Sequence, residues 1–165
     1  MSTLKTNAIT TVAGKPILNS TGSILQVVHT EYTTATALGC AALTDVSGFS
    51  AAITPSSTSS KVLVMVHFSG VLDCDGRLSI KVGGSVVKAN LSGTDRFSST
   101  GTPFNYNDAG TYCATYLHSP TSTSALTYQI AVQCGGCSQT AYFNRDPSAS
   151  ADNGRSGITL MEVSG

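Results

Sequence analysis

The stretch "KVLVMVHFSGVL", from Lys61 to Leu72, is the most strand-like part of this 165-residue chain. β-branched and aromatic residues fill it, and it is bounded by "SSTSS" before it and "DCDG" after it, both of which are typical of turns. We therefore expect one strand over residues 61–72. The apolar run within it, Val62 to Val66, is far too short to span a bilayer, so no membrane insertion is expected.

Similar runs between turn-forming clusters predict seven or eight more strands and no helix. Gly83-Gly84 joins two of them and predicts a tight hairpin, because both loop positions of a type I′ turn need a positive φ; Gly135-Gly136 predicts a second one. Residues 34–50 fit a short strand, a long loop or a partner-facing surface equally well. The other predicted strands are 24–33, 50–54, 77–82, 85–91, 111–117, 126–134, 137–143 and 156–163. This pattern predicts an all-β fold, an antiparallel β-sandwich or jelly roll.

The composition supports the same class and narrows the partners. Apolar residues make up 41% of the chain, but charged residues only 11%, against about 25% in an average globular protein. Ser, Thr and Gly replace the charged residues, which excludes long helices rich in Glu, Lys and Arg. The formal net charge is zero, so no nucleic-acid partner is expected. Lys5 is not followed by the apolar segment of a secretory signal.

The first 22 residues differ from the rest of the chain. Gly14, Pro16 and Gly22 interrupt short apolar pieces, which are too sparse to fold alone. We therefore expect two parts: an extended N-terminal segment, 1–22, and a β-sandwich domain, 23–165. The segment needs an apolar surface from another chain, as a particle-attachment segment would, through Ile9, Val12, Lys15, Pro16, Ile17 and Leu18.

The five cysteines are Cys40, Cys74, Cys113, Cys134 and Cys137. An odd, scattered set favours free thiols made in a reducing cytoplasm over a dense disulfide framework. Cys134 and Cys137 have the spacing of a zinc or redox motif, but there is no second ligand pair and no helix follows them. Packed free thiols, a cross-strand Cys134–Cys137 disulfide and a metal site stay open, with free thiols favoured.

Catalytic and metal-binding patterns are weak. "DCDG" at 73–76 has part of a calcium loop, but Gly84 stands where the distal Glu would be needed. Turn chemistry is therefore favoured, and a cation held by Asp73 and Asp75 together with other loops or at a subunit interface stays open. His29, His67 and His118 are isolated in sequence, and no GxSxG elbow or pair of cleft carboxylates can be named. We expect no enzyme activity, no catalytic residue, no metal site and no cofactor.

The segment 92–110 is a long polar loop, and loops of this length are usually functional. Its aromatic and amide side chains could stack on sugar rings and bond to their hydroxyls, or could instead pack on the sandwich or on a neighbouring subunit. The candidate receptor or glycan contacts are Phe97, Phe104, Asn105, Tyr106, Asn107 and Tyr112.

Five stretches in order also resemble a family. They are "ITTVAGKPILNSTGSILQVV" (9–28), "ITPSSTSSKVLVMV" (53–66), "SPTSTSALTYQIAV" (119–132), "YFNRD" (142–146) and "SGITLMEV" (156–163). Together they resemble tail-fibre-like virion structural proteins of marine bacteriophages, of the cyanophage type. The resemblance implies a structural protein located in the virion and made in the bacterial host cytoplasm, with an N-terminal attachment segment and a homotrimeric C-terminal β-sandwich.

The expected partners follow from that resemblance. They are other copies of the chain, other virion proteins such as capsid, portal or tail, and host-surface polysaccharide. The leading hypothesis is a short trimeric fibre or knob for host attachment. A capsid decoration protein is the first alternative, and a lectin-like carbohydrate-binding module is the alternative from another class.

Overall fold

The computed structural model describes residues 21–72, 76–89, 110–134, 140–148 and 154–165. In these ranges it is all-β and antiparallel, without a helix, which confirms the predicted fold class. The strands are β1 (Ile24–Tyr32), β2 (Thr36–Gly39), β3 (Thr44–Ile53), β4 (Lys61–Leu72), β5 (Arg77–Val82), β6 (Ser85–Lys88), β7 (Gly110–His118), β8 (Leu126–Gln133), β9 (Thr140–Phe143) and β10 (Ser156–Val163).

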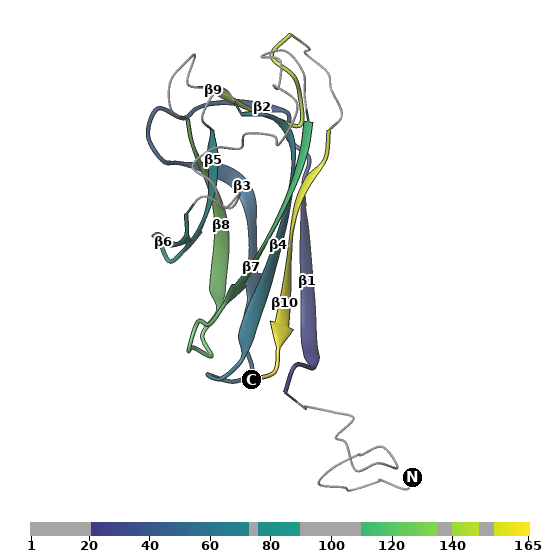
Figure 1. The fold of residues 1–165 in the computed structure, drawn as a ribbon, viewed down its shortest axis with the longest axis vertical. Helices are drawn as coiled ribbons and strands as arrows, with labels where there is room; N and C mark the ends of the chain where they lie inside the picture. The colour runs from purple at the N-terminus through teal and green to yellow at the C-terminus, as the bar shows by residue number, and fades with distance from the viewer. Residues whose placement is uncertain (1–20, 73–75, 90–109, 135–139, 149–153) are drawn as a thin grey trace, which may run out of the picture.

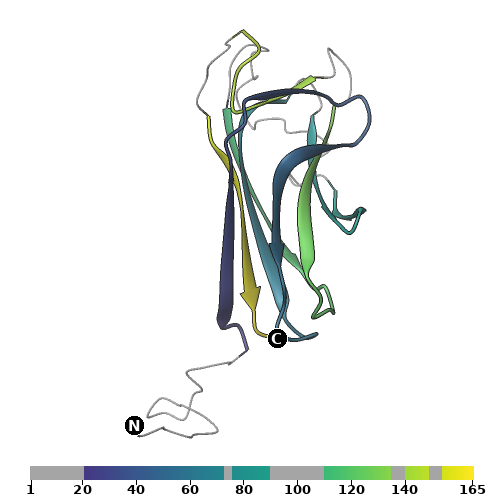
Figure 2. The same ribbon diagram turned by 180° about the vertical axis from the view of Figure 1, so that it is seen from behind.

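Two sheets face each other. The larger sheet has the order β1-β10-β4-β9-β2, with β7 paired to β4, and the smaller one has the order β3-β8-β5-β6. Figure 1 shows β1, β10, β4 and β7 side by side as long strands, and β2 and β9 running across the upper end. The reverse view in Figure 2 shows the same strands bending over that end, so the larger sheet curls into a half-barrel.

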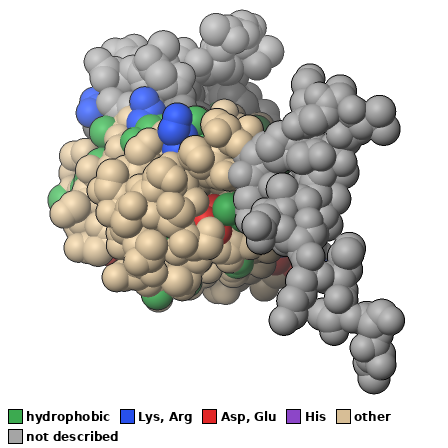
Figure 3. All heavy atoms as spheres, turned by 90° about the horizontal axis from the view of Figure 1, so that it is seen from below, with side chains coloured by type: hydrophobic (Ala, Val, Ile, Leu, Met, Phe, Trp, Pro, Cys, Tyr) green, Lys and Arg blue, Asp and Glu red, His purple; other side chains and the backbone are tan. Residues whose placement is uncertain are grey.

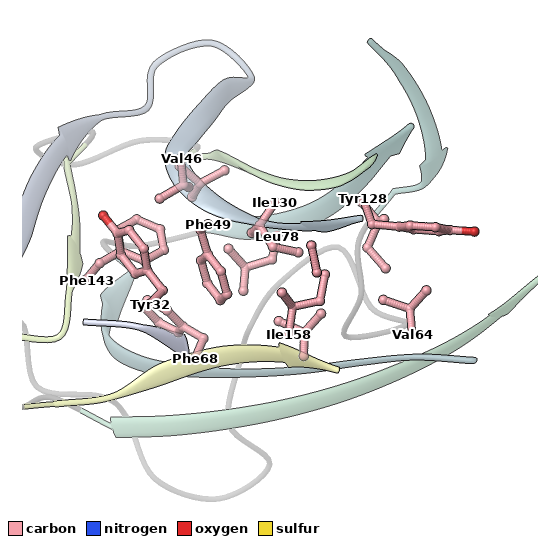
Figure 4. Packing of buried hydrophobic residues seen from close by; sticks show 14 of the residues in the cluster. Tyr32, Val46, Phe49, Val64, Phe68, Leu78, Tyr128, Ile130, Phe143 and Ile158 are labelled. Atoms are coloured by element: carbon pink, nitrogen blue, oxygen red, sulfur yellow. The ribbon is translucent and has the colours of Figure 1, made fainter. Parts of the chain in front are cut away.

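The core lies between the sheets and is built from alternate residues of their strands. Val62, Val64, Val66 and Phe68 of β4 are all buried, as period-2 alternation requires. They meet the inward residues of the smaller sheet, among them Ile130 of β8 (Figure 4). Towards the upper end the core becomes aromatic: the Phe143 ring contacts those of Phe68, Phe49 and Tyr32 at centroid distances of 4.8, 6.3 and 6.1 Å.

A bulge makes β3 longer than its sequence indicates. Val46 and Phe49 are both buried although they are three residues apart, because the ladder is interrupted between Asp45 and Ser50. Within this bulge Ser47 and Gly48 are exposed, and Gly48 has a φ of +82°. The Gln129 side-chain amide donates to the carbonyls of Val46 (2.7 Å) and Phe49 (3.2 Å). These bonds satisfy backbone groups that the irregular ladder leaves unpaired.

The larger sheet bends at Gly70. On one edge, β4 pairs with β10 from Lys61 to His67 and then with β9 from Gly70 to Leu72. Gly70 has a φ of +144°, and a Cβ there would collide with the carbonyl oxygen of Tyr142. Only glycine therefore allows β9 to approach β4 at this point.

Asn144 closes the gap where β9 ends and β10 begins. It is 1% exposed and has a left-handed φ of +57°. Its side-chain amide donates to the carbonyls of Tyr32 (2.8 Å) and Thr34 (3.1 Å), and its Oδ1 accepts from the Ser156 hydroxyl (2.8 Å). Its backbone N–H donates to the carbonyl of Ser69 (2.7 Å). One residue thus joins β1, β4, β9 and β10.

A disulfide corrects the cysteine prediction. Cys134, which follows β8, is bonded to Cys40, which follows β2, with a Cα–Cα distance of 5.1 Å, and its backbone N–H donates to the Cys40 carbonyl (2.7 Å). The expectation of a free Cys134, or of one paired with Cys137, is therefore wrong. Cys137, like Cys74, lies outside the described residues, and Cys113 is an exposed free cysteine.

The predicted Gly135-Gly136 hairpin is also wrong. β8 lies between β3 and β5 in the smaller sheet, whereas β9 lies between β2 and β4 in the larger one. Both edges of each strand are occupied, so the chain crosses from one sheet to the other between them. The Gly83-Gly84 hairpin is confirmed, with φ values of +57° and +83° between β5 and β6.

Most other predicted strands are confirmed to within a few residues, including 61–72 and 156–163. The described residues form ten strands rather than eight or nine, because 34–50 contains β2 and most of β3. Since the described chain begins at Thr21, the division at residue 22 stays a prediction.

We expect Asn144→Asp to destabilise the fold by about 2–4 kcal/mol, because a buried carboxylate would then face two carbonyls that had accepted from the amide. Urea unfolding monitored by circular dichroism measures this loss. Asn144→Gly, which tolerates the left-handed φ but makes no side-chain bonds, should also be less stable than the wild type. Equal stability of the wild type and Asn144→Asp would show that the amide bonds are unimportant.

We expect the double variant Cys40→Ala/Cys134→Ala to lose about 3–5 kcal/mol, because the disulfide closes a loop between residues 94 apart. The matched control is Cys113→Ala, which removes an exposed free thiol and should change stability by less than about 0.5 kcal/mol. Unfolding curves with and without reductant should differ for the wild type and for the control, but not for the double variant.

Candidate functional site

Most residues predicted to carry function fall outside the described ranges. The attachment residues Ile9, Val12, Lys15, Pro16, Ile17 and Leu18 precede Thr21, and the loop residues Phe97, Phe104, Asn105, Tyr106 and Asn107 lie between β6 and β7. Asp73 and Asp75 of the "DCDG" turn are outside as well. These assignments stay predictions.

Tyr112 is the one candidate glycan contact that the structure describes. It lies on β7, half-buried, and its ring stacks on Phe68 with 5.6 Å between centroids. Burial raises the pKa of its hydroxyl to about 12. Part of the Tyr112 ring therefore packs against the core. The contact of Tyr112 with a glycan stays a prediction.

The three histidines lie on the larger sheet and differ in environment. His118 Nδ1 is 2.8 Å from the buried Tyr128 hydroxyl, and burial lowers the pKa of the imidazole. His29 is exposed on β1, with Nδ1 2.8 Å from the Thr159 hydroxyl. His29 and His67 both lie over Gly157, where an added Cβ would be 3.0 and 3.4 Å from their rings. Among the described residues, no three His, Cys, Asp or Glu side chains are placed to hold a metal.

The most unusual surface is the outer face of β1, β10, β4 and β7. The strand register aligns Val27, Met161, Leu63 and Leu117 in one row across all four strands. The next row is His29, Thr159, Met65 and Thr115. Val27 is 55% exposed, Met65 39% and Leu117 48%. We call Val27, Leu63, Met65, Leu117 and Met161 the apolar face.

The charged residues of this outer face lie at its margins. Glu31 is near the upper end and pairs with Arg155 at 3.4 Å; both side chains are more than half exposed. Lys61 starts β4 at the lower end. An exposed ion pair of this kind contributes little to stability. Between these margins the described outward positions carry no Asp, Glu, Lys or Arg side chain.

The outer face of the smaller sheet provides the contrast. Its exposed and half-buried outward positions include Asp45, Lys81, Thr127 and Gln129, and Lys81 forms an ion pair with Asp45 at 2.6 Å, whereas Ser79 and Ala131 in the same outward register are buried. This alternation of apolar inward and polar outward residues is normal for an antiparallel sheet with one solvated face. The larger sheet departs from it, and an exposed contiguous apolar patch usually marks an interaction site.

The lower end of the sandwich is where the chain leaves towards residues 1–20. Seen from below in Figure 3, the described part of this end shows mainly backbone and side chains that are neither hydrophobic nor charged. The first described residues are fixed there by two backbone hydrogen bonds of 2.8 Å, from Gly22 to Ser164 and from Ser164 to Ser23. A segment continuing from Thr21 therefore starts at a rigid point.

A buried carboxylate reinforces this end. The side chain of Glu162 is fully buried; it accepts from the Gln26 amide at 2.6 Å and from the backbone N–H and hydroxyl of Ser56 at 2.7 Å each. Burial alone would raise the pKa of Glu162, but the hydrogen bonds outweigh it and hold the pKa at about 2. Glu162 is thus a fixed anion that ties β10 to β1 and to the β3–β4 turn.

Neither the apolar face nor Glu162 was predicted from the sequence. A signal for the apolar face is present in "KVLVMVHF", because its outward positions, Leu63 and Met65, are as apolar as its inward ones. No local pattern marks Glu162, whose partners are 106 and 136 residues away in the chain.

No family model matches the chain, and no curated protein matches it. The described part of the chain holds no helix long and apolar enough to cross a membrane.

We expect the contribution of Glu162 to the free energy of unfolding to depend on pH. Its pKa is about 2 when folded against an ordinary 4.5, so its contribution is complete above pH 4.5 and is lost as the pH falls towards 2. At pH 7, Glu162→Gln should be about 2–3 kcal/mol less stable than the wild type, and this gap should narrow below pH 4.5. Urea unfolding between pH 7 and 2.5 measures the gap.

Glu31→Gln is the control for this prediction, because it removes a carboxylate that is more than half exposed. It should change stability by less than about 0.5 kcal/mol at pH 7. A gap for Glu162→Gln that stays constant over the whole pH range would show that the carboxylate does not titrate as described.

Proposed function

We propose that this chain is a phage virion structural protein without enzymatic activity. Its β-sandwich forms a homotrimeric knob or short fibre, residues 1–22 attach it to the particle, and the assembly contributes to attachment to the host surface. The observation that carries the proposal is the apolar face, which suits a subunit that works by assembling with other chains.

Two further features support an assembling subunit. The net charge is zero, so copies do not repel one another through it. The described core is complete without the N-terminal segment in the sense that both of its sheets begin after Ser23. We assign Ile9, Val12, Ile17 and Leu18 of that segment to contact with another virion protein.

The resemblance in sequence is what suggests that the particle is a phage virion. The five stretches that resemble tail-fibre-like proteins include β10, most of β8 and the Asn144 junction, so the resemblance falls largely on residues that shape the sandwich. A capsid decoration protein would share these features and differ in its copy number.

We expect a chain that lacks residues 1–20 to fold but to be absent from purified particles of the encoding phage. Circular dichroism and the intact Cys40–Cys134 disulfide report folding, and mass spectrometry of the particles reports incorporation. A full-length variant with Ile9, Val12, Ile17 and Leu18 all changed to Ser keeps the chain length and should be excluded in the same way.

Two outcomes would contradict this reading. Incorporation of both altered chains at normal levels would show that the segment does not attach the protein. Absence of the wild-type chain from the particles would refute the virion function itself. The copy number per particle separates a fibre from a decoration protein, because only the latter follows the capsid lattice.

A further inference from the structure

We infer that the apolar face is the surface through which copies of this chain hold one another, around an axis that runs along the strands of the larger sheet. This inference deepens the proposed function and rests on it for the three-fold symmetry. The occupant of the face is thus the same face of neighbouring copies.

The row pattern favours such an axis. The apolar row of Val27, Met161, Leu63 and Leu117 lies at one height along the strands, and the row containing Glu31, Gly157, His67 and Cys113 lies at another. Rotation about an axis parallel to the strands leaves every row at its own height. Apolar side chains therefore meet apolar ones.

The strands at the two sides of the apolar face, β1 and β7, are placed to contact the neighbouring copies. Among the described strands, β1 pairs only with β10 and β7 pairs only with β4, so these two are the outermost described strands beside β10 and β4. Gly110–His118 carries no Lys, Arg, Asp, Glu or Pro, the residues that usually protect an exposed edge. Around the proposed axis, the β1 margin of one copy lies beside the β7 margin of the next, so Val27 approaches Leu117 of the partner subunit.

The outer surface that carries the apolar face sets an upper limit on the contact. Four strands about 4.8 Å apart, each about nine residues long at about 3.3 Å per residue, cover roughly 600 Å². Three such surfaces around one axis bury up to about 1,800 Å² in all, or about 600 Å² for each pair of copies, so each pairwise contact is modest and the closed ring of three contacts holds the copies together. The near absence of charge also lowers the desolvation cost of bringing the faces together.

The test compares two double variants of the full-length chain. Met65→Lys/Leu117→Lys places two charges on the apolar face, at side chains that are 39% and 48% exposed. Leu43→Lys/Val86→Lys is the matched control, at side chains that are 38% and 44% exposed and lie outside the face. Light scattering after size-exclusion chromatography measures the mass, and circular dichroism confirms that each variant is folded.

We expect the wild type and the control to have three times the 16.9 kDa subunit mass, and the face variant to be monomeric at the same concentration. Two buried charges should weaken association on the order of 100-fold or more. A dimer that the face variant alone dissociates supports the apolar face as the interface and contradicts only the three-fold symmetry of the proposed function.

Three results would overturn the inference: a monomeric wild type, a face variant that keeps the wild-type mass, or a control that dissociates equally. Limited proteolysis tests the other possible occupant of the apolar face, which is the chain's own segment 1–20. If the face variant keeps its mass but exposes residues 1–20 to the protease, the chain's own N-terminal segment covers the face and the inference fails. None of these results depends on whether the protein is found in particles.

Discussion

The architecture depends on one junction in the larger sheet, where one edge of β4 stops pairing with β10 and starts pairing with β9. Two strands can share one edge only if the gap between them is filled by groups that replace the missing ladder bonds. Asn144 does this with both its backbone and its side chain, reaching the carbonyls of Ser69, Tyr32 and Thr34. Because β9 then turns across the upper end, Phe143 enters the core between the two sheets.

The two ends of the sandwich are held in different ways, and this determines what lies between them. At the upper end, the Cys40–Cys134 disulfide joins the bent part of the larger sheet to the smaller sheet. At the lower end, Glu162 joins three segments through charge-assisted hydrogen bonds. Between these ends, β1, β10, β4 and β7 of the larger sheet pair in regular register, with one bulge near Ile24. The apolar face lies on this regular part, where neighbouring side chains form continuous rows.

The sequence predicted the parts of the fold that follow from local patterns. Residues 61–72 alternate against the core, and Gly83-Gly84 supplies two positive φ values, so both were found. β3 was largely missed because its bulge breaks the alternation between Val46 and Phe49. The disulfide and the Asn144 junction depend on which strands become neighbours, and residue spacing carries no information about that.

Local sequence patterns also do not show which face of a strand stays exposed, and for this reason the apolar face was not predicted from β4. In β4 the inward residues Val64 and Val66 and the outward residues Leu63 and Met65 are all apolar, so the strand looks equally suited to either face. Strands that read as continuous apolar runs are normally covered on both faces. The smaller sheet covers one face of β4, and nothing in the described part of the chain covers Met65 or Leu117. The described fold therefore explains the apolar run of β4 only in part, and the outward half of that run is the part that the proposed contact between copies would cover.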